Sequence, residues 1–260
     1  MEVDALPAPV ALVTGASRGR GIGAAVCRAL AGRRCDICFT YWRPYDETMP
    51  WGSDAGAPET LQDNLRALGV RCESLEADLR DPNVPLRVLD FAEGRLGPLS
   101  ILVNNATHST SDGYEHLDAA TLDAHYAVNV RATLLLSVEF ARRFKGSAGG
   151  RIINLTSGQS LGPMPNELAY GATKGAVEAF TRSLSAGVAA RGITVNAINP
   201  GPNDTGWMTD EVKREVLARS PRGRIGRPED AARLIAFLAS DEADWITGQV
   251  INSEGGFLRR

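Results

Sequence analysis

Short apolar runs alternate with stretches of helical periodicity along the whole chain. The apolar runs have the length of buried strands, and we predict strands at 9–14, 35–41, 70–76, 99–104, 151–156, 193–198 and 249–252. The stretches between them predict helices at 22–33, 59–68, 84–96, 117–144, 167–190 and 228–239. Strands that alternate with helices form parallel sheets covered on both faces. We therefore predict an α/β fold, with one doubly wound parallel sheet in a single domain over residues 1–260.

Two segments interrupt this alternation. Trp42–Pro58 is rich in proline, glycine and aromatic residues, and Pro200–Met208 follows the sixth predicted strand. Loops of this length in a compact domain are often functional. Both follow strands, so they are expected at the carboxyl edge of the sheet, where open α/β sheets bind ligands.

The composition excludes several classes of function. The 260 residues include 28 Lys and Arg against 31 Asp and Glu, and 43% are hydrophobic, which is an ordinary globular balance. The net charge of −3 argues against a nucleic-acid partner. No apolar run approaches the ~18 residues of a membrane helix. The acidic start lacks a signal-peptide core, and four cysteines make no disulfide framework, so we expect a cytoplasmic protein.

A metal site is not expected. Cys35 and Cys38 form a CxxC pattern, but they fall in a predicted strand, where positions three apart face opposite sides. His108, His116 and His125 have no metal-ligand spacing and no cysteine partners.

A glycine-rich turn lies between the first predicted strand and the first helix. It reads Thr14-Gly-Ala-Ser-Arg-Gly-Arg-Gly-Ile-Gly23. A turn of this kind before a helix lets backbone N–H groups and the helix dipole meet a pyrophosphate. Its place in the first strand–helix unit favours dinucleotide binding over a simple tight turn.

A second pattern suggests proton transfer. Tyr170 and Lys174 are four residues apart and therefore share one helix face. A free tyrosine has a pKa of about 10, and a nearby ammonium lowers it. Tyr170 could then exchange a proton with a carbonyl or alcohol oxygen.

Taken together, these motifs resemble the short-chain dehydrogenase/reductase family over nearly the whole chain. The resemblance rests on the glycine turn, on Asn104-Asn-Ala106, on Asn129 and Ser157, on Tyr170-Gly-Ala-Thr-Lys174 and on Pro200-Gly201. The C-terminal run from Gly226-Arg-Pro-Glu-Asp to Ile246-Thr-Gly-Gln is similar to the 3-oxoacyl-[acyl-carrier-protein] reductases. The resemblance implies a Rossmann-type sheet and a nicotinamide cofactor.

The resemblance also implies roles for individual residues. The catalytic set would be Asn129, Ser157, Tyr170 and Lys174, in which Ser157 orients the substrate oxygen. Lys174 would also hold the nicotinamide ribose, and Asn129 would anchor a water that links Lys174 to solvent. Cofactor contacts are implied at Gly15, Ser17, Arg18, Gly21, Ile22, Gly23, Tyr41, Asp78, Leu79, Asn105, Ala106, Tyr170, Lys174, Pro200, Gly201, Asn203 and Thr205.

The glycine turn permits two alignments with the family motif. Gly15, Gly19 and Gly21 keep the family spacing but place Arg20 where isoleucine is usual. The alternative, Gly15, Gly21, Ile22 and Gly23, keeps the Gly-Ile-Gly run at the cost of two inserted residues. We favour the second alignment because the helix then continues as the family's first helix does.

The end of the second strand bears on the choice of cofactor. Proteins that prefer NAD carry an acidic residue there for the ribose hydroxyls, whereas the run Phe39–Arg43 has none before Asp46. Arg18 and Arg43 could pair with a 2′-phosphate, which suits the guanidinium group. We predict NADP(H), with NAD(H) as the less favoured alternative.

The sequence therefore predicts an NADPH-dependent reductase that converts a ketone to a secondary alcohol. The substrate would be a small carbonyl compound or an acyl thioester, with an acyl-carrier protein as a possible partner. Family resemblance suggests a homotetramer built through Leu117–Phe144, Glu167–Ala190 and the C-terminal strand. An alcohol dehydrogenase or a specialised-metabolism ketoreductase remains an alternative. A non-catalytic NADP(H)-binding regulator is a further one, which the intact catalytic set disfavours.

Overall fold

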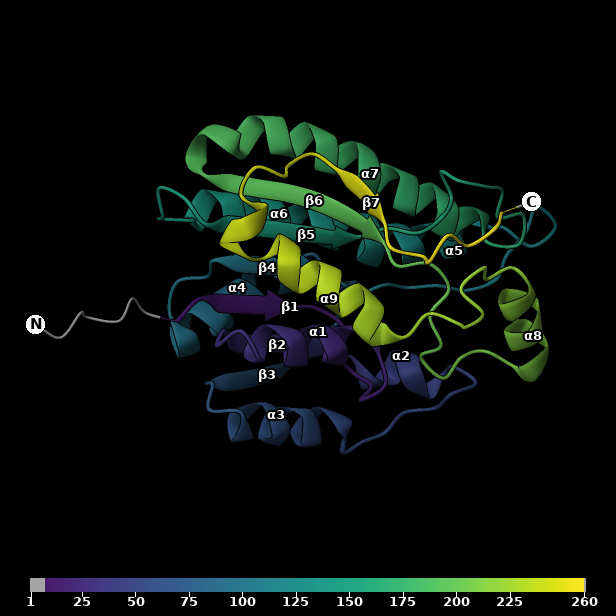
Figure 1. Cartoon of the computed structure of the whole chain (residues 1–260), viewed down its shortest axis with the longest axis horizontal. Coiled ribbons are helices and arrows are strands. Elements are labelled where there is room, and N and C mark those ends of the chain that lie inside the picture. The colour runs from purple at the N-terminus through teal and green to yellow at the C-terminus, as the bar shows by residue number, and fades with distance from the viewer. Residues whose placement is uncertain (1–7, 260) are drawn as a thin grey trace, which may run out of the picture.

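All seven predicted apolar runs form strands, and these strands pair in parallel in one sheet. The computed structural model describes residues 8–259, so the first seven residues, which bear on the expected lack of a signal peptide, lie outside it. The order is β3-β2-β1-β4-β5-β6-β7 (Figure 1). Their bounds are β1 (Val10–Val13), β2 (Asp36–Tyr41), β3 (Cys72–Glu76), β4 (Ile101–Asn104), β5 (Gly150–Leu155), β6 (Ile193–Asn199) and β7 (Val250–Asn252). The predicted Rossmann-type α/β fold is confirmed.

Helices cover both faces of the sheet. One buried cluster joins the sheet to α1 (Ile22–Ala31), α3 (Ala57–Ala67) and α9 (Pro228–Leu238). The other joins it to α4 (Val84–Leu96), α6 (Thr133–Arg143) and the end of α7 (Leu168–Val188). Burial of each large aliphatic side chain in these clusters stabilises the fold by roughly 1.5–3 kcal/mol. The amphipathic periodicity predicted five of these six helices to within a few residues, whereas α6 begins well inside the predicted helix 117–144.

The cysteines belong to these two cores. Cys35 packs in the cluster beneath α1, and Cys38 packs in the cluster beneath α4. The prediction that they face opposite sides of the strand is therefore confirmed. All four cysteines are free and buried, and the described residues contain no group of histidine, cysteine and acidic side chains that could hold a metal ion.

The structure departs from the predicted helices in three places. The region 117–144 is not uniform, because α5 (Ala119–His125) continues into a π-helix, η1 (Tyr126–Ala132), before α6. The segment Trp42–Pro58 contains a short helix, α2 (Arg43–Glu47), and a helix that was not predicted, α8 (Asp210–Ala218), follows Pro200–Met208. Short 3₁₀ turns, η2 (Ala189–Arg191) and η3 (Asp241–Ala243), follow α7 and α9.

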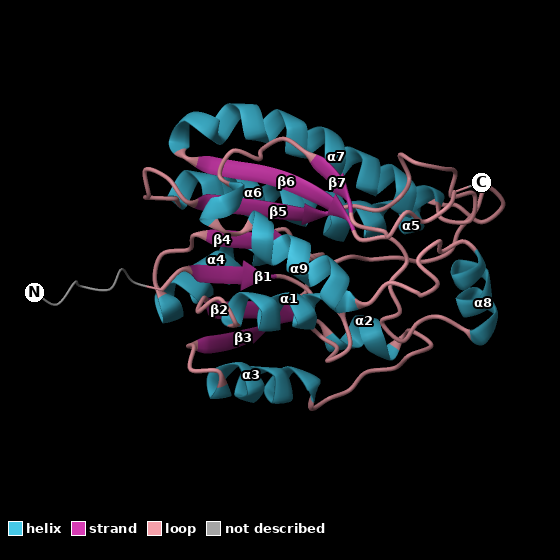
Figure 2. Cartoon of the chain, viewed as in Figure 1, coloured by secondary structure: helices cyan, strands magenta, loops and turns pink. Residues whose placement is uncertain are grey.

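The carboxyl ends of the strands share one edge of the sheet, where the long loops gather (Figure 2). The strand order reverses between β1 and β4, which is the point where open α/β sheets form a ligand crevice. Among the described helices, none has both the length and the apolar character needed to cross a bilayer.

Candidate active site

The glycine-rich turn after β1 packs directly on the loop that follows β4. Gly15 has a φ of +75°, and a Cβ atom added to it would lie 2.6 Å from the Cα of Ala106. A Cβ on Gly23 would lie 2.6 Å from the carbonyl oxygen of Gly15 and 2.8 Å from Asn105 Nδ2. Only glycine fits at these two positions, so bare backbone forms this part of the sheet edge.

Thr14 and Asn105 fasten the two turns together. The amide of Asn105 donates hydrogen bonds of 2.8 Å to the carbonyl oxygens of Thr14 and Gly15. The hydroxyl oxygen of Thr14 accepts from the N–H groups of Asn105 at 3.1 Å and Ala106 at 3.0 Å. These bonds fix the glycine turn at the strand-order reversal.

The N-terminus of α1 points its free N–H groups toward this edge. The helix begins at Ile22 after Gly21, which as N-cap residue has no side chain to fill the end. No acidic residue occupies the first turn either, so the N–H groups remain open to an anion. Gly19 lies on an outer turn, where an added Cβ would meet nothing within 4 Å. This geometry favours the alignment through Gly21, Ile22 and Gly23.

Three residues of the expected catalytic set meet at the ends of β5 and α7. Tyr170 and Lys174 lie one turn apart on α7, and the Ser157 side chain lies close to the phenol. The ammonium of Lys174 lies 5.4 Å from the centre of the Tyr170 ring. It donates a 2.9 Å hydrogen bond to the carbonyl oxygen of Leu155, the last residue of β5.

Burial dominates the acid–base properties of this pair. It raises the pKa of Tyr170 to about 12, although the hydrogen bond with Ser157 opposes the rise. It lowers the pKa of Lys174 from its ordinary 10.5 to about 8, because the ammonium lies almost entirely out of water. The expected lowering of the Tyr170 pKa by Lys174 is not found in this structure.

Asn129 lies in the π-helix and ties the loop after β4 to α7. Its Nδ2 donates to the carbonyl oxygen of His108 at 2.9 Å and to Thr173 Oγ1 at 3.0 Å. Its Oδ1 accepts from the His108 N–H at 2.7 Å and from the Thr107 hydroxyl at 3.1 Å. The anchoring of a water by Asn129 stays a prediction.

The His108 side chain is held between two aromatic rings. Its ring lies 4.7 Å from that of His125 and 5.4 Å from that of Tyr45. Burial, reinforced by His125 and Arg80, lowers the pKa of His108 to about 4. The imidazole is therefore neutral at physiological pH. It adds an uncharged ring to the loop whose backbone Asn129 binds.

Asp112 caps α7 and was missed by the sequence analysis. Its carboxylate accepts from the N–H groups of Leu168 at 2.7 Å and Ala169 at 2.8 Å, which open α7. Burial alone would raise the pKa of Asp112, but the backbone N–H donors outweigh it and hold the pKa below its usual range. The cap comes from a distant loop, so no local capping motif marks it.

Arg18 bridges the two long loops. Its guanidinium donates to the Thr205 carbonyl oxygen at 3.1 Å and lies 3.4 Å from the carboxylate of Asp46. It also stacks over the ring of Trp51 at 4.6 Å. The indole N–H of Trp51 donates to the same carboxylate at 2.8 Å. The buried Asp46, which the sequence analysis noted only as the first carboxylate after β2, orients Arg18 here.

Arg43 is held more tightly than expected. It makes a bidentate pair with Glu76, at 3.1 Å and 3.0 Å, and lies over the ring of Tyr41 at 5.1 Å. The Ser17 hydroxyl accepts from the N–H of Trp42 at 3.0 Å, which joins the glycine turn to the end of β2. Thus β2 ends without its own carboxylate, but Glu76 from β3 reaches Arg43.

A pocket of about 310 Å³ opens beside the ends of β2 and β3. Trp42, Glu76 and Asp78 are among its lining residues. Asp78, an expected adenine contact, pairs with Arg80 at 2.7 Å, while Leu79 next to it is buried. The pocket therefore lies where the adenosine end of a cofactor is expected.

The turn after β6 is held by hydrogen bonds between asparagine side chains and its backbone groups. Gly201 has a φ of +66°, and its N–H donates to the side-chain oxygen of Asn199 at 3.0 Å. The amide of Asn203 donates to the carbonyl oxygens of Pro200 at 2.7 Å and Gly201 at 3.1 Å. Asn203, an expected cofactor contact, is buried and fixes the turn through its side chain.

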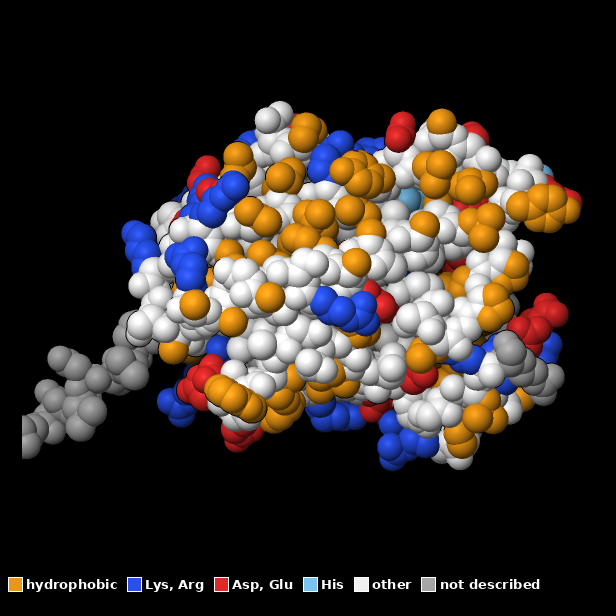
Figure 3. All heavy atoms as spheres, turned by 90° about the horizontal axis from the view of Figure 1, so that it is seen from above, with side chains coloured by type: hydrophobic (Ala, Val, Ile, Leu, Met, Phe, Trp, Pro, Cys, Tyr) orange, Lys and Arg blue, Asp and Glu red, His pale blue; other side chains and the backbone are white. Residues whose placement is uncertain are grey.

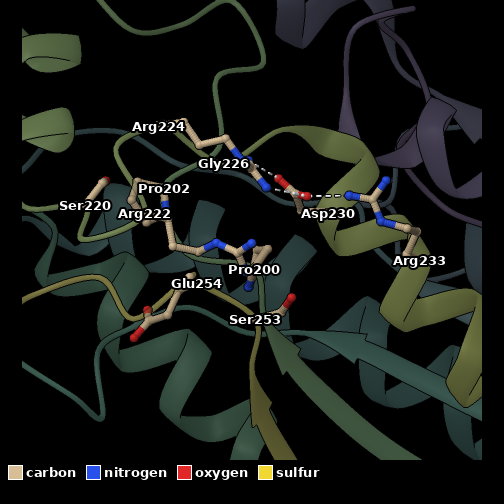
Figure 4. Close-up of a pocket in the computed structure, with 11 residues that line it drawn as sticks. Pro200, Pro202, Ser220, Arg222, Arg224, Gly226, Asp230, Arg233, Ser253 and Glu254 are labelled. Atoms are coloured by element: carbon tan, nitrogen blue, oxygen red, sulfur yellow. Dashed lines mark hydrogen bonds and ion pairs between the residues drawn. The ribbon is translucent and has the colours of Figure 1, made fainter.

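A second pocket, of about 280 Å³, lies on the other side of this turn (Figure 4). Arg222 extends across it, while Arg224 and Arg233 both point to Asp230, at 2.6 Å and 2.5 Å. Glu254 also lines the pocket but turns its carboxylate away from Arg222.

The chain is similar to known proteins over nearly its whole length. A family model described as enoyl-(acyl carrier protein) reductase matches residues 15–258. An uncharacterized oxidoreductase of Bacillus subtilis, YjdA, is 56% identical over 252 residues, which cover 96% of this chain and 97% of that protein. A solved short-chain dehydrogenase/reductase from Serratia marcescens has a TM-score of 0.85 and 32% identity, covering 97% and 98% of the two chains. A metagenomic blue fluorescent protein in complex with NADPH has the same TM-score, identity and coverage.

The chain therefore belongs to the short-chain dehydrogenase/reductase family. Members of this family are oxidoreductases that act on CH–OH and C=O groups with NAD(P)H.

Proposed function

We propose that this protein reduces a ketone to a secondary alcohol with NADPH, most like a 3-oxoacyl-thioester reductase, and that residues 1–260 form one domain in the cytoplasm. The observation that carries the proposal is the grouping of Ser157, at the end of β5, with Tyr170 and the buried ammonium of Lys174, which lies 5.4 Å from the centre of the Tyr170 ring. A phenol with a raised pKa keeps its proton at neutral pH and is ready to donate it.

The proposed proton transfer uses only side chains of this chain. Ser157 donates a hydrogen bond to the substrate oxygen and orients the carbonyl carbon. Tyr170 donates its proton to that oxygen as the bond order of the carbonyl falls. Lys174 then stabilises the phenolate, because a buried positive charge favours a nearby negative one. Asn129 holds α7 and the loop after β4 in register.

The glycine turn fits a dinucleotide. Gly15 and Gly23 leave no room for a Cβ, and the first turn of α1 carries neither a side-chain cap nor an acidic residue. Gly21, Ile22 and Gly23 would hold the diphosphate, and Asp78 and Leu79 would hold the adenine. Asn105, Ala106, Pro200, Gly201, Asn203 and Thr205 would hold the nicotinamide end. When bound, the nicotinamide supplies the hydride that reduces the carbonyl carbon.

NADPH is preferred in this proposal because β2 ends without a carboxylate for the ribose hydroxyls. Arg18 and Arg43 lie beside this end, with Tyr41 beneath Arg43 and Ser17 bonded to the next backbone N–H. Either arginine would have to exchange a present partner for the 2′-phosphate. The NADPH complex of the metagenomic relative supports the same choice.

The test is the loss of cofactor absorbance with an acetoacetyl thioester, measured with NADPH and with NADH. Turnover with NADPH, at least tenfold faster than with NADH, is the expected result. Turnover with NADH alone would overturn the roles of Arg18 and Arg43. Binding of NADPH without turnover on a broad panel of ketones and alcohols would favour a non-catalytic regulator, whereas turnover of other ketones alone would favour a specialised-metabolism ketoreductase.

A homotetramer is part of the proposal. Figure 3, which looks onto the molecule from above, shows hydrophobic side chains gathered across the middle of that face. Trp245, just before the edge strand β7, is 98% exposed. Light scattering should give about four times the chain mass, and Trp245→Ala should shift the protein toward smaller species. A wild-type monomer would contradict this.

A further inference from the structure

The last residues of the chain turn back onto the loop that carries Ser157. After β7, Gly255 and Gly256 adopt φ values of +64° and +77°, which reverse the backbone. The segment then runs along the carboxyl edge of the sheet to the C-terminus (Figure 1). The N–H of Leu258 donates to the carbonyl oxygen of Arg219, at the end of α8, at 2.9 Å, and the side-chain Nε of Arg219 donates to the carbonyl oxygen of Leu258 at 2.8 Å.

Arg259 lies in a seat formed by two glycines. A Cβ atom on Gly158 would overlap the guanidinium of Arg259, and one on Gly162 would lie 3.3 Å from the Cβ of Arg259. Neither Gly158 nor Gly162 has the positive φ that favours glycine for backbone reasons. Their lack of a side chain is therefore explained by the arginine that passes over them. Gly158 directly follows Ser157, so the guanidinium lies one residue from the proposed catalytic serine.

Glu254 holds one edge of this guanidinium and leaves the other free. Arg259 Nη2 donates to Glu254 Oε2 at 2.6 Å, and Asn199 donates to the same oxygen at 2.9 Å. The side chains of Arg259 and Glu254 are 18% and 9% exposed. Within the described residues, Arg259 Nε is buried without a hydrogen-bond partner. A buried donor without a partner is costly, and a ligand oxygen would satisfy it.

From this arrangement, and resting on the proposed function, we propose that Arg259 is a specificity-determining residue that donates hydrogen bonds to a second oxygen of the substrate. Ser157 and Tyr170 are assigned to the oxygen of the ketone that is reduced, and the guanidinium lies against Gly158, the residue that follows Ser157. The Arg259–Glu254 pair is neutral in sum, so it suits a neutral carbonyl oxygen better than a carboxylate. The preferred substrate class is a 1,3-dicarbonyl compound of the 3-oxo ester or thioester type.

The test compares ethyl 3-oxobutanoate with heptan-2-one, which has the same chain length but lacks both ester oxygens, including the second carbonyl. The oxo ester is intrinsically more reactive, so the informative quantity is the change in the ratio of the two kcat/KM values between proteins. In Arg259→Met, which keeps most of the side-chain stem, this ratio should fall about tenfold or more. Arg33→Met, at an exposed site beyond α1, should keep the wild-type ratio. A ratio within twofold of wild type in Arg259→Met overturns the proposal.

A double-mutant cycle tests the glycine seat. Gly158→Ala should lower the ratio as Arg259→Met does, because the added methyl group displaces the guanidinium. Adding Gly158→Ala to Arg259→Met should then lower the ratio no further. A full additional fall in the double variant would mean that the glycine acts through Ser157, and it would overturn the seat.

Two further arms separate the possible failures. The first arm adds 3-oxobutanoate, the free acid. If Arg259→Met lowers kcat/KM relative to heptan-2-one only for this acid and not for the ester, then Arg259 binds a carboxylate and the neutral-oxygen proposal is wrong. If wild type reduces no ketone, the proposed function fails, but binding of ethyl 3-hydroxybutanoate to the NADP⁺-loaded protein still tests the site by calorimetry. Its Kd should rise about tenfold in Arg259→Met, and an equal Kd overturns the proposal.

Discussion

The two halves of the carboxyl edge are built in different ways. Around Tyr170, groups from β5, α7 and the π-helix are fixed by buried hydrogen bonds to backbone atoms, such as Lys174 to Leu155 and Asn129 to His108. Around Arg18, a single guanidinium from the glycine-rich turn joins the two long loops, through the side chains of Asp46 and Trp51 and through the carbonyl and hydroxyl oxygens of Thr205. The first half is held by the sheet and its helices, and the second by segments that sheet geometry does not determine.

This difference indicates which functions tolerate rearrangement. Proton transfer needs Tyr170 held to a fraction of an ångström, and backbone partners provide that precision. A cofactor phosphate can be reached by a guanidinium that changes partners, which loops allow. We therefore expect substitutions near Tyr170 to abolish turnover, and those near Arg18 to change cofactor affinity.

The largest effect is expected from Lys174→Met. Loss of the buried ammonium should lower kcat/KM for ketone reduction about 100-fold or more.

The same residue should affect stability. The pKa of Lys174 is about 8 in the folded protein and ordinarily 10.5, so the unfolded chain binds more protons between these pH values. The unfolding free energy of wild type should therefore rise with pH across this window, by up to about 3 kcal/mol.

Lys174→Met should lack this rise, which urea unfolding at pH 7.5 and pH 10 would measure. If the kcat/KM of Lys174→Met lies within tenfold of the wild-type value, the half of the carboxyl edge around Tyr170 is not where reduction takes place.

The next effect is a pH dependence of reduction. Tyr170, with a pKa of about 12, stays protonated throughout the accessible range, whereas Lys174 loses its charge near pH 8. The kcat/KM for reduction should be flat below pH 7 and fall toward tenfold per unit above pH 8. A profile that stays flat to pH 10 would contradict the role of the ammonium.

Arg18→Met should affect binding more than turnover. We expect the Kd for NADPH to rise about tenfold, because one charge-assisted contact with the 2′-phosphate is lost. The Kd for NADH should stay within twofold. Arg43→Met is the matched comparison and should have a smaller effect, because Glu76 already holds Arg43 bidentately. Fluorescence titration would measure all four values, and equal losses for both cofactors would remove Arg18 from cofactor selection.

The smallest effect on turnover is expected from Asp112→Ala. Removal of this cap from α7 should lower the unfolding free energy by about 1–2 kcal/mol in urea at pH 7. Asp112→Asn, which keeps an acceptor, should lose less. Because the pKa of Asp112 is held below its usual range, its contribution should be present above pH 4 and disappear as the pH falls. An unchanged midpoint in Asp112→Ala would show that α7 needs no cap.

The sequence was sufficient for the sheet because apolar runs and helical periodicity are local signals. It also marked Tyr170, Lys174 and Ser157, whose spacing follows from one helix and one strand end. The helix α8 was missed although Thr209 caps Val212 and two acidic residues follow it, a signal that was present in the sequence. The π-helix was missed because its apolar pattern does not differ enough from that of an α-helix.

Other features could not be predicted because their partners are distant in sequence. Asp112 and the N–H of Leu168 are separated by 56 residues, and Arg18 and Thr205 by 187. The seat of Arg259 was invisible because Gly158 carries no special φ and the tail returns from the far end of the chain. Only the fold brings these groups together. They decide which side chains are held at the edge of the site.

The central claim is tested most directly by following the hydride in wild type and in Tyr170→Phe. With NADPH deuterated at the transferred C4 position and ethyl 3-oxobutanoate, mass spectrometry should find one deuterium on the carbinol carbon of the alcohol formed by wild type. Tyr170→Phe should bind NADPH as wild type does. It should form the labelled alcohol at least about 100-fold more slowly than wild type. Labelled product at a comparable rate in both proteins would contradict proton donation by Tyr170.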